Sequence, residues 1–304
     1  MKASLPALPT CPAPFPAAFV TLLHGVLASP VPLHGGRDDR TRARRQQLGH
    51  SGTFVGHRAY SPGDDLRQLD WAAYARSGEL VCKQLADEDR RTAALLLDVS
   101  PSLLVGAPPR RLHALRLAAL LGGLALVHLD GLTVIVPGAG SDAVTTWSGL
   151  GALPALLRHL ERLPVVVPPA DHAVELVLAR GVPGRVHWIS DFAEPRAFER
   201  PLRALRRRGA RVIGWLPELP GDHEPPAGGY LRVVDPETGA DLLVPVDAAF
   251  AKALREQLAQ LARQQDRLFA SAGAWLQRWT VPAGAELTVA PYRDIAGRSV
   301  LWTR

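Results

Sequence analysis

The sequence has very little lysine and cysteine. Amino groups on side chains occur only at Lys2, Lys83 and Lys252, and none of these follows a glycine, so the phosphate-binding loop G-x-x-x-x-G-K-[ST] is absent. The two cysteines, Cys11 and Cys82, support neither a disulfide framework nor a cysteine-based zinc site. These absences exclude a P-loop ATPase and a disulfide-rich secreted domain. They favour a reducing compartment, and we expect the protein to be cytoplasmic.

Formal charge is missing from residues 3–36, so a signal peptide or a membrane anchor has to be considered there. Five prolines before Ala17 break the first half of this stretch, and His24 and Pro30 interrupt the second half. A targeting segment needs an unbroken apolar helix. A second apolar stretch, residues 117–127, is too short to span a bilayer and is typical of a core helix. We therefore expect no stable membrane span.

The formal net charge of +6 comes almost entirely from arginine, as in many proteins that bind nucleic acid. The basic runs at residues 42–45 and 203–211 contain no interleaved aromatic side chains that would stack on bases. The second run also precedes Gly209 at the expected end of a helix, where cations complement the helix dipole. We expect solvated arginines and no nucleic-acid partner, and we keep a basic nucleic-acid-binding protein as an alternative.

Changes in composition divide the 304 residues into four segments. Residues 1–45 form a Pro-rich lead, a short apolar helix and an Arg-rich linker. Residues 46–92 form a small β-rich accessory segment of short strands and turns, without a helical period. Residues 93–217 form an α/β core. Residues 218–304 add a hairpin, a long helix that Asp247 can cap, and C-terminal strands.

The core segment alternates buried strands with helices. Residues 93–97 are a continuous apolar run, and further strands are expected at 132–136, 185–190 and 211–216, with helical patterns between them. Residues 144–147 form a further strand, joined to the strand at 132–136 as a hairpin. This alternation predicts an α/β fold with a doubly wound, mostly parallel sheet and helices on both faces.

Oxygen-bearing side chains follow the first buried strand at Asp98-Val99-Ser100-Pro101-Ser102. Ligands of open parallel sheets collect outside the carboxyl ends of the strands, and a carboxylate with two hydroxyls offers hard oxygen donors to Mg²⁺ or a similar cation. A later strand ends at Ser190-Asp191, which brings a second carboxylate to the same edge. Alternatively, Asp98 and the serines only make hydrogen bonds in turns and caps, and Asp191 caps the helix that begins near Pro195.

This order of elements, with Asp98-x-Ser100-x-Ser102 after one strand and Ser190-Asp191 after another, resembles the von Willebrand factor A-type domain and its metal-ion-dependent adhesion site. The segment Tyr60-Ser61-Pro62-Gly63-Asp64-Asp65-Leu66-Arg67-Gln68-Leu69-Asp70-Trp71 is similar to the hallmark of the bacterial domain-of-unknown-function family 58. Asp235-Pro236-Glu237-Thr238-Gly239 is similar to a later segment of that family.

The resemblance implies a von Willebrand A-like fold, a metal-assisted binding face, and work alongside a MoxR-type AAA+ ATPase in the assembly or activation of other proteins. The cation, Mg²⁺ or another divalent ion, would capture an acidic side chain of a client protein. The family's threonine is missing near residues 170–172, which leaves Asp171 as a substitute oxygen ligand. The other ligands that the resemblance implies are Asp98, Ser100, Ser102 and Asp191.

The motif from Tyr60 to Trp71 has two interpretations. Its charged side chains can form a network that locks the segment on the sheet domain, with Trp71 as an apolar anchor. Alternatively, the motif is a docking surface for the ATPase or its client. The side chains concerned are Tyr60, Asp64, Asp65, Arg67, Asp70 and Trp71, and the charge network also includes Arg76.

Enzymatic chemistry has little support in the spacing of the remaining residues. No H-E-x-x-H pair occurs, and Ser100 lacks the G-x-S-x-G elbow that would let it act with His128 or His187. The glycine-rich segment 138–143 is followed by a strand, where a dinucleotide-binding fold needs a helix. We expect a metal-dependent adaptor that is not an enzyme, and we keep a metal-dependent hydrolase using the same crevice as the alternative.

Overall fold

The computed structural model describes residues 11–28, 52–60, 69–87, 92–129, 131–167, 170–179, 184–222, 224 and 228–280. For residues 52–58, 83–87 and 170–171 it describes the backbone alone. The chain divides into two compact units, a larger one from residues 1–32 and 91–303 and a smaller one centred on residues 33–90. Each unit is described below by itself.

A six-stranded sheet lies at the centre of the larger unit, in the order β10-β7-β6-β3-β4-β5. Neighbouring strands run parallel except β5, which pairs antiparallel with β4 as the expected hairpin. The prediction of a mixed α/β fold with a mostly parallel sheet is therefore confirmed. The strands are β3 (Thr92–Leu97), β4 (Gly131–Ile135), β5 (Val144–Trp147), β6 (Arg185–Ile189), β7 (Arg211–Glu218) and β10 (Trp275–Thr280).

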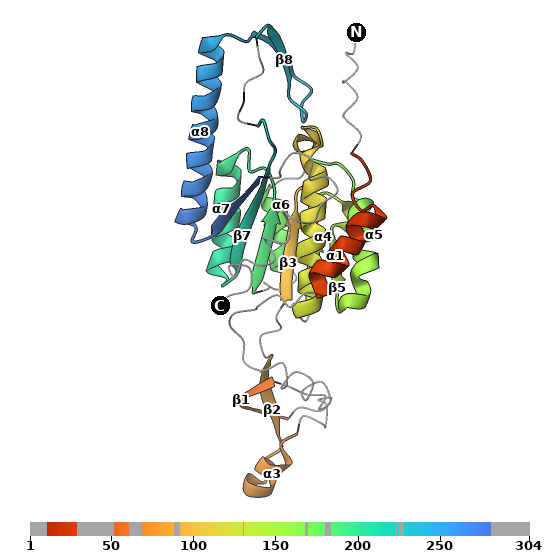
Figure 1. The fold of residues 1–304 in the computed structure, drawn as a ribbon. Helices are drawn as coiled ribbons and strands as arrows, with labels where there is room; N and C mark the ends of the chain where they lie inside the picture. The colour runs from red at the N-terminus through yellow and green to blue at the C-terminus, as the bar shows by residue number, and fades with distance from the viewer. Residues whose placement is uncertain are drawn as a thin grey trace. The chain divides into compact units, whose positions relative to one another are not determined.

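Helices cover both faces of this sheet (Figure 1). On one face lie α1 (Ala17–Ala28), α4 (Arg110–His128) and α5 (Leu153–Glu161), and on the other lie α6 (Ala170–Ala179), α7 (Pro195–Arg207) and α8 (Ala248–Ser271). The central strand β3 supplies both cores because its side chains alternate: Leu95 and Leu97 join the first, and Ala94 and Leu96 join the second. All four side chains are buried, which explains the uninterrupted apolar run in the sequence.

The short apolar helix expected near the N-terminus is α1, and it belongs to the core of the larger unit. Phe19 and Leu23 are 1% and 0% exposed. Arg116 of α4 donates a hydrogen bond from Nε to the carbonyl of Pro14 at 3.0 Å, and its guanidinium lies 5.2 Å from the centre of the Phe19 ring. The segment that contains Pro14 and Phe19 therefore packs against α4 through both polar and apolar contacts.

The core helix expected around residues 117–127 is confirmed as α4, which is longer than the apolar run alone. By length and composition it is the one helix in the described part of the chain that could cross a membrane, and 89% of that stretch is buried inside the unit. A cap for its C-terminus comes from Leu129, whose N–H donates to the carbonyl of Ala125.

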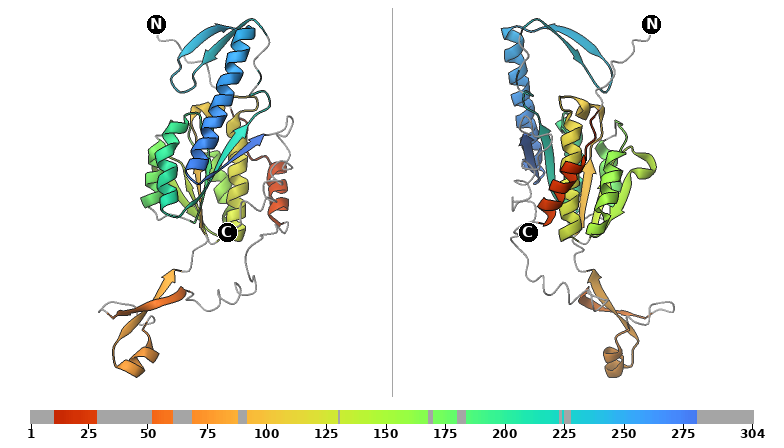
Figure 2. Two further views of the ribbon diagram at one scale, coloured as in Figure 1. Left: turned by 90° about the vertical axis from the view of Figure 1, so that its left-hand side faces the viewer. Right: turned by 45° about the vertical axis from the view of Figure 1, so that its right-hand side comes forward.

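A hairpin and the long helix α8 follow the sheet strand β7. The hairpin consists of β8 (Tyr230–Val234) and β9 (Asp241–Pro245), which pair antiparallel. The predicted cap of α8 is confirmed, because Asp247 accepts a hydrogen bond at 2.7 Å from the N–H of Phe250. The hairpin and the N-terminal part of α8 extend beyond the end of the sheet (Figures 1 and 2).

The C-terminal strand that the sequence left unplaced is β10, which pairs parallel with β7 at the edge of the sheet. Its Trp279 is 6% exposed and meets His113 of α4 edge-on, with the ring centres 6.3 Å apart. Short 3₁₀ turns complete the unit at η2 (Pro101–Leu104), η3 (Gly140–Asp142) and η4 (Leu150–Ala152).

The smaller unit contains β1 (Gly52–Ala59) and β2 (Val81–Asp87), which pair antiparallel, and the helix α3 (Trp71–Ser77). The expectation of strands and turns without a helix is wrong at this point. A seven-residue helix forms because both of its ends are capped. Asp70 accepts hydrogen bonds from the N–H groups of Ala72 and Ala73, and Gly78 takes the left-handed conformation at φ 73°.

Candidate metal site at the carboxyl edge of the sheet

Two central strands end side by side and bring distant polar residues together. β3 and β6 are neighbours in the sheet, with Leu97 opposite Ile189, and the N–H of Asp98 donates to the carbonyl of Ile189 at 3.0 Å. The Ser190 hydroxyl donates to Oδ2 of Asp98 at 2.7 Å. The prediction that these two strand ends share one edge is therefore confirmed.

The three alternating oxygen side chains after β3 form one cluster. Oδ1 of Asp98 accepts from the N–H of Ser100 at 2.8 Å, and the Ser100 and Ser102 hydroxyl oxygens lie 2.8 Å apart. Ser100 is 4% exposed and precedes the 3₁₀ turn η2, which folds Ser102 back toward it. A carboxylate and two hydroxyls thus converge at the end of β3.

Burial makes the negative charge of Asp98 costly. It raises the pKa of this carboxyl above its ordinary value, and the hydrogen bonds from Ser190 and Ser100 counteract that effect in part. The neighbouring negative charge of Asp191 raises the pKa of Asp98 further. A partly buried carboxylate beside a second one is a position where added positive charge is favourable.

Asp191 lies in the loop between β6 and α7. Its Oδ1 accepts from the N–H of Ala193 at 3.1 Å, and α7 has Glu194 at its N-cap without any side-chain cap bond. The alternative role of Asp191 as the cap of α7 is therefore wrong. Its carboxylate forms a local turn next to Asp98.

A glutamine from α8 fixes this loop from the other side. Gln265 is 3% exposed, and its Nε2 donates to the backbone carbonyls of Asp191 and Phe192 at 3.2 and 3.1 Å. Nη2 of Arg278 in β10 donates in turn to Oε1 of Gln265 at 3.0 Å. Phe192 has φ 48°, an unusual backbone conformation that these contacts hold in place. Sequence analysis missed Gln265, whose only signal is a polar residue on the apolar side of α8.

Glu237 is a further acidic residue near the site that sequence analysis did not place there. It lies in the turn of the β8–β9 hairpin, which Asp235 stabilises by accepting the N–H of Glu237 at 2.9 Å. Its pKa is raised by burial and then by the negative charges of Asp191 and Asp98. The turn therefore comes within electrostatic range of the strand ends, as the course of the hairpin in Figures 1 and 2 also indicates.

The donor chemistry of the site fits a hard divalent cation, with carboxylates at Asp98 and Asp191 and hydroxyls at Ser100 and Ser102. Carboxylate, histidine and cysteine side chains alone form no group of three or more that could hold a metal among the described residues. The backbone of Asp171 lies in the first turn of α6, and its side chain lies outside the described part of the chain. Metal binding stays a prediction.

The motif from Tyr60 to Trp71 is only partly described, since Asp64, Asp65 and Arg67 lie outside the described residues. Tyr60 donates its N–H to the carbonyl of Leu80 at 3.0 Å. Asp70 caps α3, and Trp71 is 61% exposed on that helix. The anchoring of this motif on the sheet unit stays a prediction.

The histidines considered for a nucleophilic serine are placed elsewhere. Among the described residues no histidine hydrogen-bonds to Ser100, whose hydroxyl lies against Ser102. His187 is buried within β6, its Nδ1 accepts from Nε1 of Trp215 at 3.2 Å, and burial lowers its pKa to about 4. The arrangement of a serine with an adjacent histidine base is not present in this part of the chain.

The strands from β2 to β9 and the residues of the candidate metal site lie within a stretch of sequence that other bacterial proteins share. Residues 56–267 match the family described as Protein of unknown function DUF58. The chain belongs to this family. The DUF58 chain is also 29% identical over 221 residues to uncharacterized proteins of Mycobacterium bovis and Mycobacterium tuberculosis, with 68% of this chain and 68% of each relative covered.

Two solved structures show a weaker similarity to this chain. The first is the conserved hypothetical protein BatB from Bacteroides thetaiotaomicron, with a TM-score of 0.39 and 15% identity, covering 67% of this chain and 97% of that one. The second is an aerotolerance-related membrane protein from Bacteroides fragilis, with a TM-score of 0.36 and 14% identity, covering 69% of this chain and 98% of that one. Similarity at this level carries no argument about function.

Proposed function

We propose that this DUF58 protein is a cation-dependent adaptor with a von Willebrand factor A-like fold. It binds an acidic side chain of a client protein and works with a MoxR-type AAA+ ATPase in the assembly or activation of other proteins. The observation that carries the proposal is the convergence of Asp98, Ser100 and Ser102 at the carboxyl edge of the sheet, next to Asp191.

Each of these residues has a distinct task in the proposal. Asp98 and the two serine hydroxyls hold Mg²⁺ or another divalent cation directly, while Asp191 and Asp171 contribute directly or through water. The N–H of Ser100 and the hydroxyl of Ser190 orient the Asp98 carboxylate before any cation arrives. Because two of its ligands are neutral hydroxyls, a bound cation supplies an electron-poor centre that attracts a carboxylate from another protein.

Cation binding is tested by thermal unfolding of the full chain with MgCl₂, MnCl₂ or a chelator. At a cation concentration about 100 times the dissociation constant, we expect stabilisation of about 2.7 kcal/mol, which corresponds to a rise of roughly 5–10 °C. Asp98→Ala abolishes this rise. The matched control Glu161→Ala, an exposed acid on α5, keeps it. A rise that survives Asp98→Ala contradicts the proposal.

Partner binding is tested by co-purification with a MoxR-type AAA+ ATPase from the same genome. We expect the complex to dissociate in chelator and to be lost in Asp98→Ala but kept in Glu161→Ala. A complex that is indifferent to both treatments refutes the cation-dependent part. Turnover of a phosphoester or ester substrate that is lost in Asp98→Ala would instead support the alternative function, a metal-dependent hydrolase.

A further inference from the structure

Helix α7 presents a row of arginines to solvent. Its apolar residues Leu202 and Leu205 are buried at 0% exposure against the sheet. At about 100° of rotation per residue, the four exposed arginines fall within about 60° of one another and extend over about 16 Å of helix. We call this set the arginine face; it consists of Arg196, Arg200, Arg203 and Arg207.

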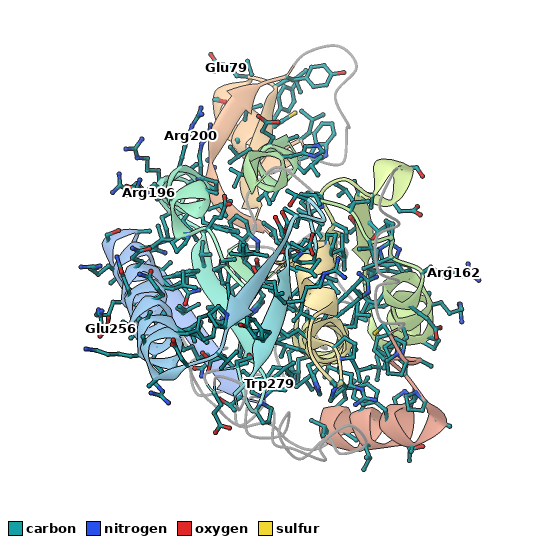
Figure 3. All side chains as sticks on the ribbon, turned by 90° about the horizontal axis from the view of Figure 1, so that it is seen from above. Glu79, Arg162, Arg196, Arg200, Glu256 and Trp279 are labelled. Atoms are coloured by element: carbon teal, nitrogen blue, oxygen red, sulfur yellow. The ribbon has the colours of Figure 1, made fainter. Side chains whose placement is uncertain are left out.

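Most of this charge has no counterpart within the described part of the chain. Arg203 pairs with Glu199 at 2.8 Å, and both side chains remain about half exposed. No ion pair or hydrogen bond joins Arg196, Arg200 or Arg207 to a described residue. Figure 3 shows Arg196 and Arg200 pointing outward from α7. Three guanidinium groups, those of Arg196, Arg200 and Arg207, are therefore available to an external partner, and Arg203 beside them is half exposed and paired with Glu199.

Other arginines and lysines of the larger unit differ from this row. Arg206, on the same helix, donates from Nη1 to the carbonyl of Ala210 at 2.6 Å and so has a structural role. On α8 acids lie among the cations, as Lys252 lies 3.9 Å from Glu256.

The surface between these side chains is a shallow, open depression. It has a volume of about 400 Å³ and is lined by the arginine face together with Glu199 and Ala204. Glu199 within the lining disfavours a surface of purely negative charge, such as a phosphate backbone.

Acidic side chains that precede α7 also disfavour a long polyanion as the ligand. The arginine face begins directly after Asp191 and Glu194, and the charge of Glu237 interacts with both. A long polyanion that continued past the start of α7 would meet these acids and be repelled. An acidic segment of limited length is the ligand that this pattern fits.

We propose that the arginine face of α7 is a docking surface for an acidic helix of a partner protein. Carboxylates at i, i+4, i+7 and i+11 on such a helix repeat the spacing of the four arginines. Arginine binds carboxylates through paired, charge-assisted hydrogen bonds, which favours this partner chemistry. This inference goes beyond the proposed function and does not rest on the cation site.

The test uses the full chain and a fluorescent, alanine-based peptide of about 20 residues, long enough to populate a helix, with glutamates at that spacing. We expect Arg196→Gln, Arg200→Gln and Arg207→Gln together to weaken the anisotropy-measured affinity roughly tenfold. The matched control, Lys252→Gln with Arg255→Gln and Arg263→Gln, removes the same number of charges from exposed positions on α8 and changes affinity less than about twofold. Binding also persists in chelator and in Asp98→Ala, which separates it from the cation site.

Several outcomes would overturn the inference. One is no binding of the peptide to the unmodified protein, and another is an equal loss in the two triple variants. A third is tighter binding of duplex DNA or of vesicles containing phosphatidylglycerol, lost in the α7 variant, because either result would assign the arginine face to a phosphate ligand. A peptide with the same number of glutamates in consecutive positions should bind more weakly than the spaced peptide. Equal binding of the two peptides would show that the arginine face does not recognise the helical spacing of the glutamates.

Discussion

The residue that most constrains the candidate site is Asp98. Its carboxylate is partly buried and accepts hydrogen bonds from the N–H of Ser100 and the hydroxyl of Ser190. Burial nevertheless raises its pKa, so the charged form is held at some cost to stability near neutral pH. Residues kept at such a cost are common at functional sites, where stability is traded for activity.

Replacing Asp98 by asparagine separates stability from cation binding. In chelator at pH 7, we expect Asp98→Asn to be as stable as the original protein or more stable by up to about 1 kcal/mol, because the buried charge is gone and the amide still hydrogen-bonds. Asp98→Ala leaves two donors without an acceptor and loses about 1–3 kcal/mol. Both variants lose the stabilisation by Mg²⁺. Urea unfolding measures these differences, and an asparagine variant less stable than the alanine variant would contradict this account.

The sequence predicts the candidate cation ligands of this site better than it predicts the residues of other elements that lie beside them. Asp98, Ser100, Ser102 and Asp191 are recognisable because each follows a short apolar run that forms a strand. Gln265 and Glu237 reach the same region from α8 and from a hairpin turn. Their positions depend on how distant elements pack, and no local pattern encodes that.

At the scale of elements, the packing of α8 on β7 depends on the absence of a side chain at Gly214. A Cβ built there would lie 2.3 Å from Cζ of Phe269 and 3.2 Å from Cζ of Phe192. Phe269 is 1% exposed and meets Phe192 edge-on at 5.0 Å between ring centres. This contact holds the end of α8 that carries Gln265 close to the loop of the candidate site.

Gly214→Ala should therefore destabilise the larger unit by about 1–3 kcal/mol, measured as a shift of the urea midpoint at constant m value. Gly151→Ala is the matched control, since no atom lies within 4 Å of its Cβ, and it should change stability by less than about 0.5 kcal/mol. Phe269→Leu in the Gly214→Ala background should recover part of the loss. Additive losses in that double variant would show that the two positions do not clash.

Elements with short, mainly apolar segments were predictable, and elements defined by pairing or capping were not. The strands β3, β4, β6 and β7 coincide with such segments, since both of their faces are largely buried. The helix α3 is too short for a helical period, and its caps were the only signal. The strand β10 pairs with β7 across about 60 residues of sequence, and its burial pattern shows no clear alternation.

At the scale of the whole molecule, two buried histidines make stability depend on pH. Burial lowers the pKa of His187 to about 4, with a further contribution from the charge of Arg185. Burial and the charge of Arg116 lower the pKa of His113 to about 4 as well. Because the ordinary value is 6.5, protons bind the unfolded chain more readily than the folded one. The stabilisation is complete above pH 6.5 and is lost as the pH falls toward 4.

We expect the free energy of unfolding to fall by roughly 2–4 kcal/mol between pH 7 and pH 5 from these two groups. Urea unfolding at several pH values measures this slope. His187→Gln together with His113→Gln should flatten it, whereas His24→Gln, at an exposed position on α1, should leave it unchanged. If the unmodified protein, the double histidine variant and His24→Gln all show the same slope, the pH dependence of stability comes from other groups.

The position of β10 has a consequence for how the protein is made. Leu23 of α1 and Trp279 of β10 belong to one apolar cluster, although more than 250 residues of sequence separate them. During translation that cluster stays incomplete until Trp279 has been synthesised and has emerged from the ribosome. The smaller unit, whose strands and helix lie within residues 52–87, needs no such wait. We therefore expect the small unit to acquire structure during translation and the sheet unit to mature only after it.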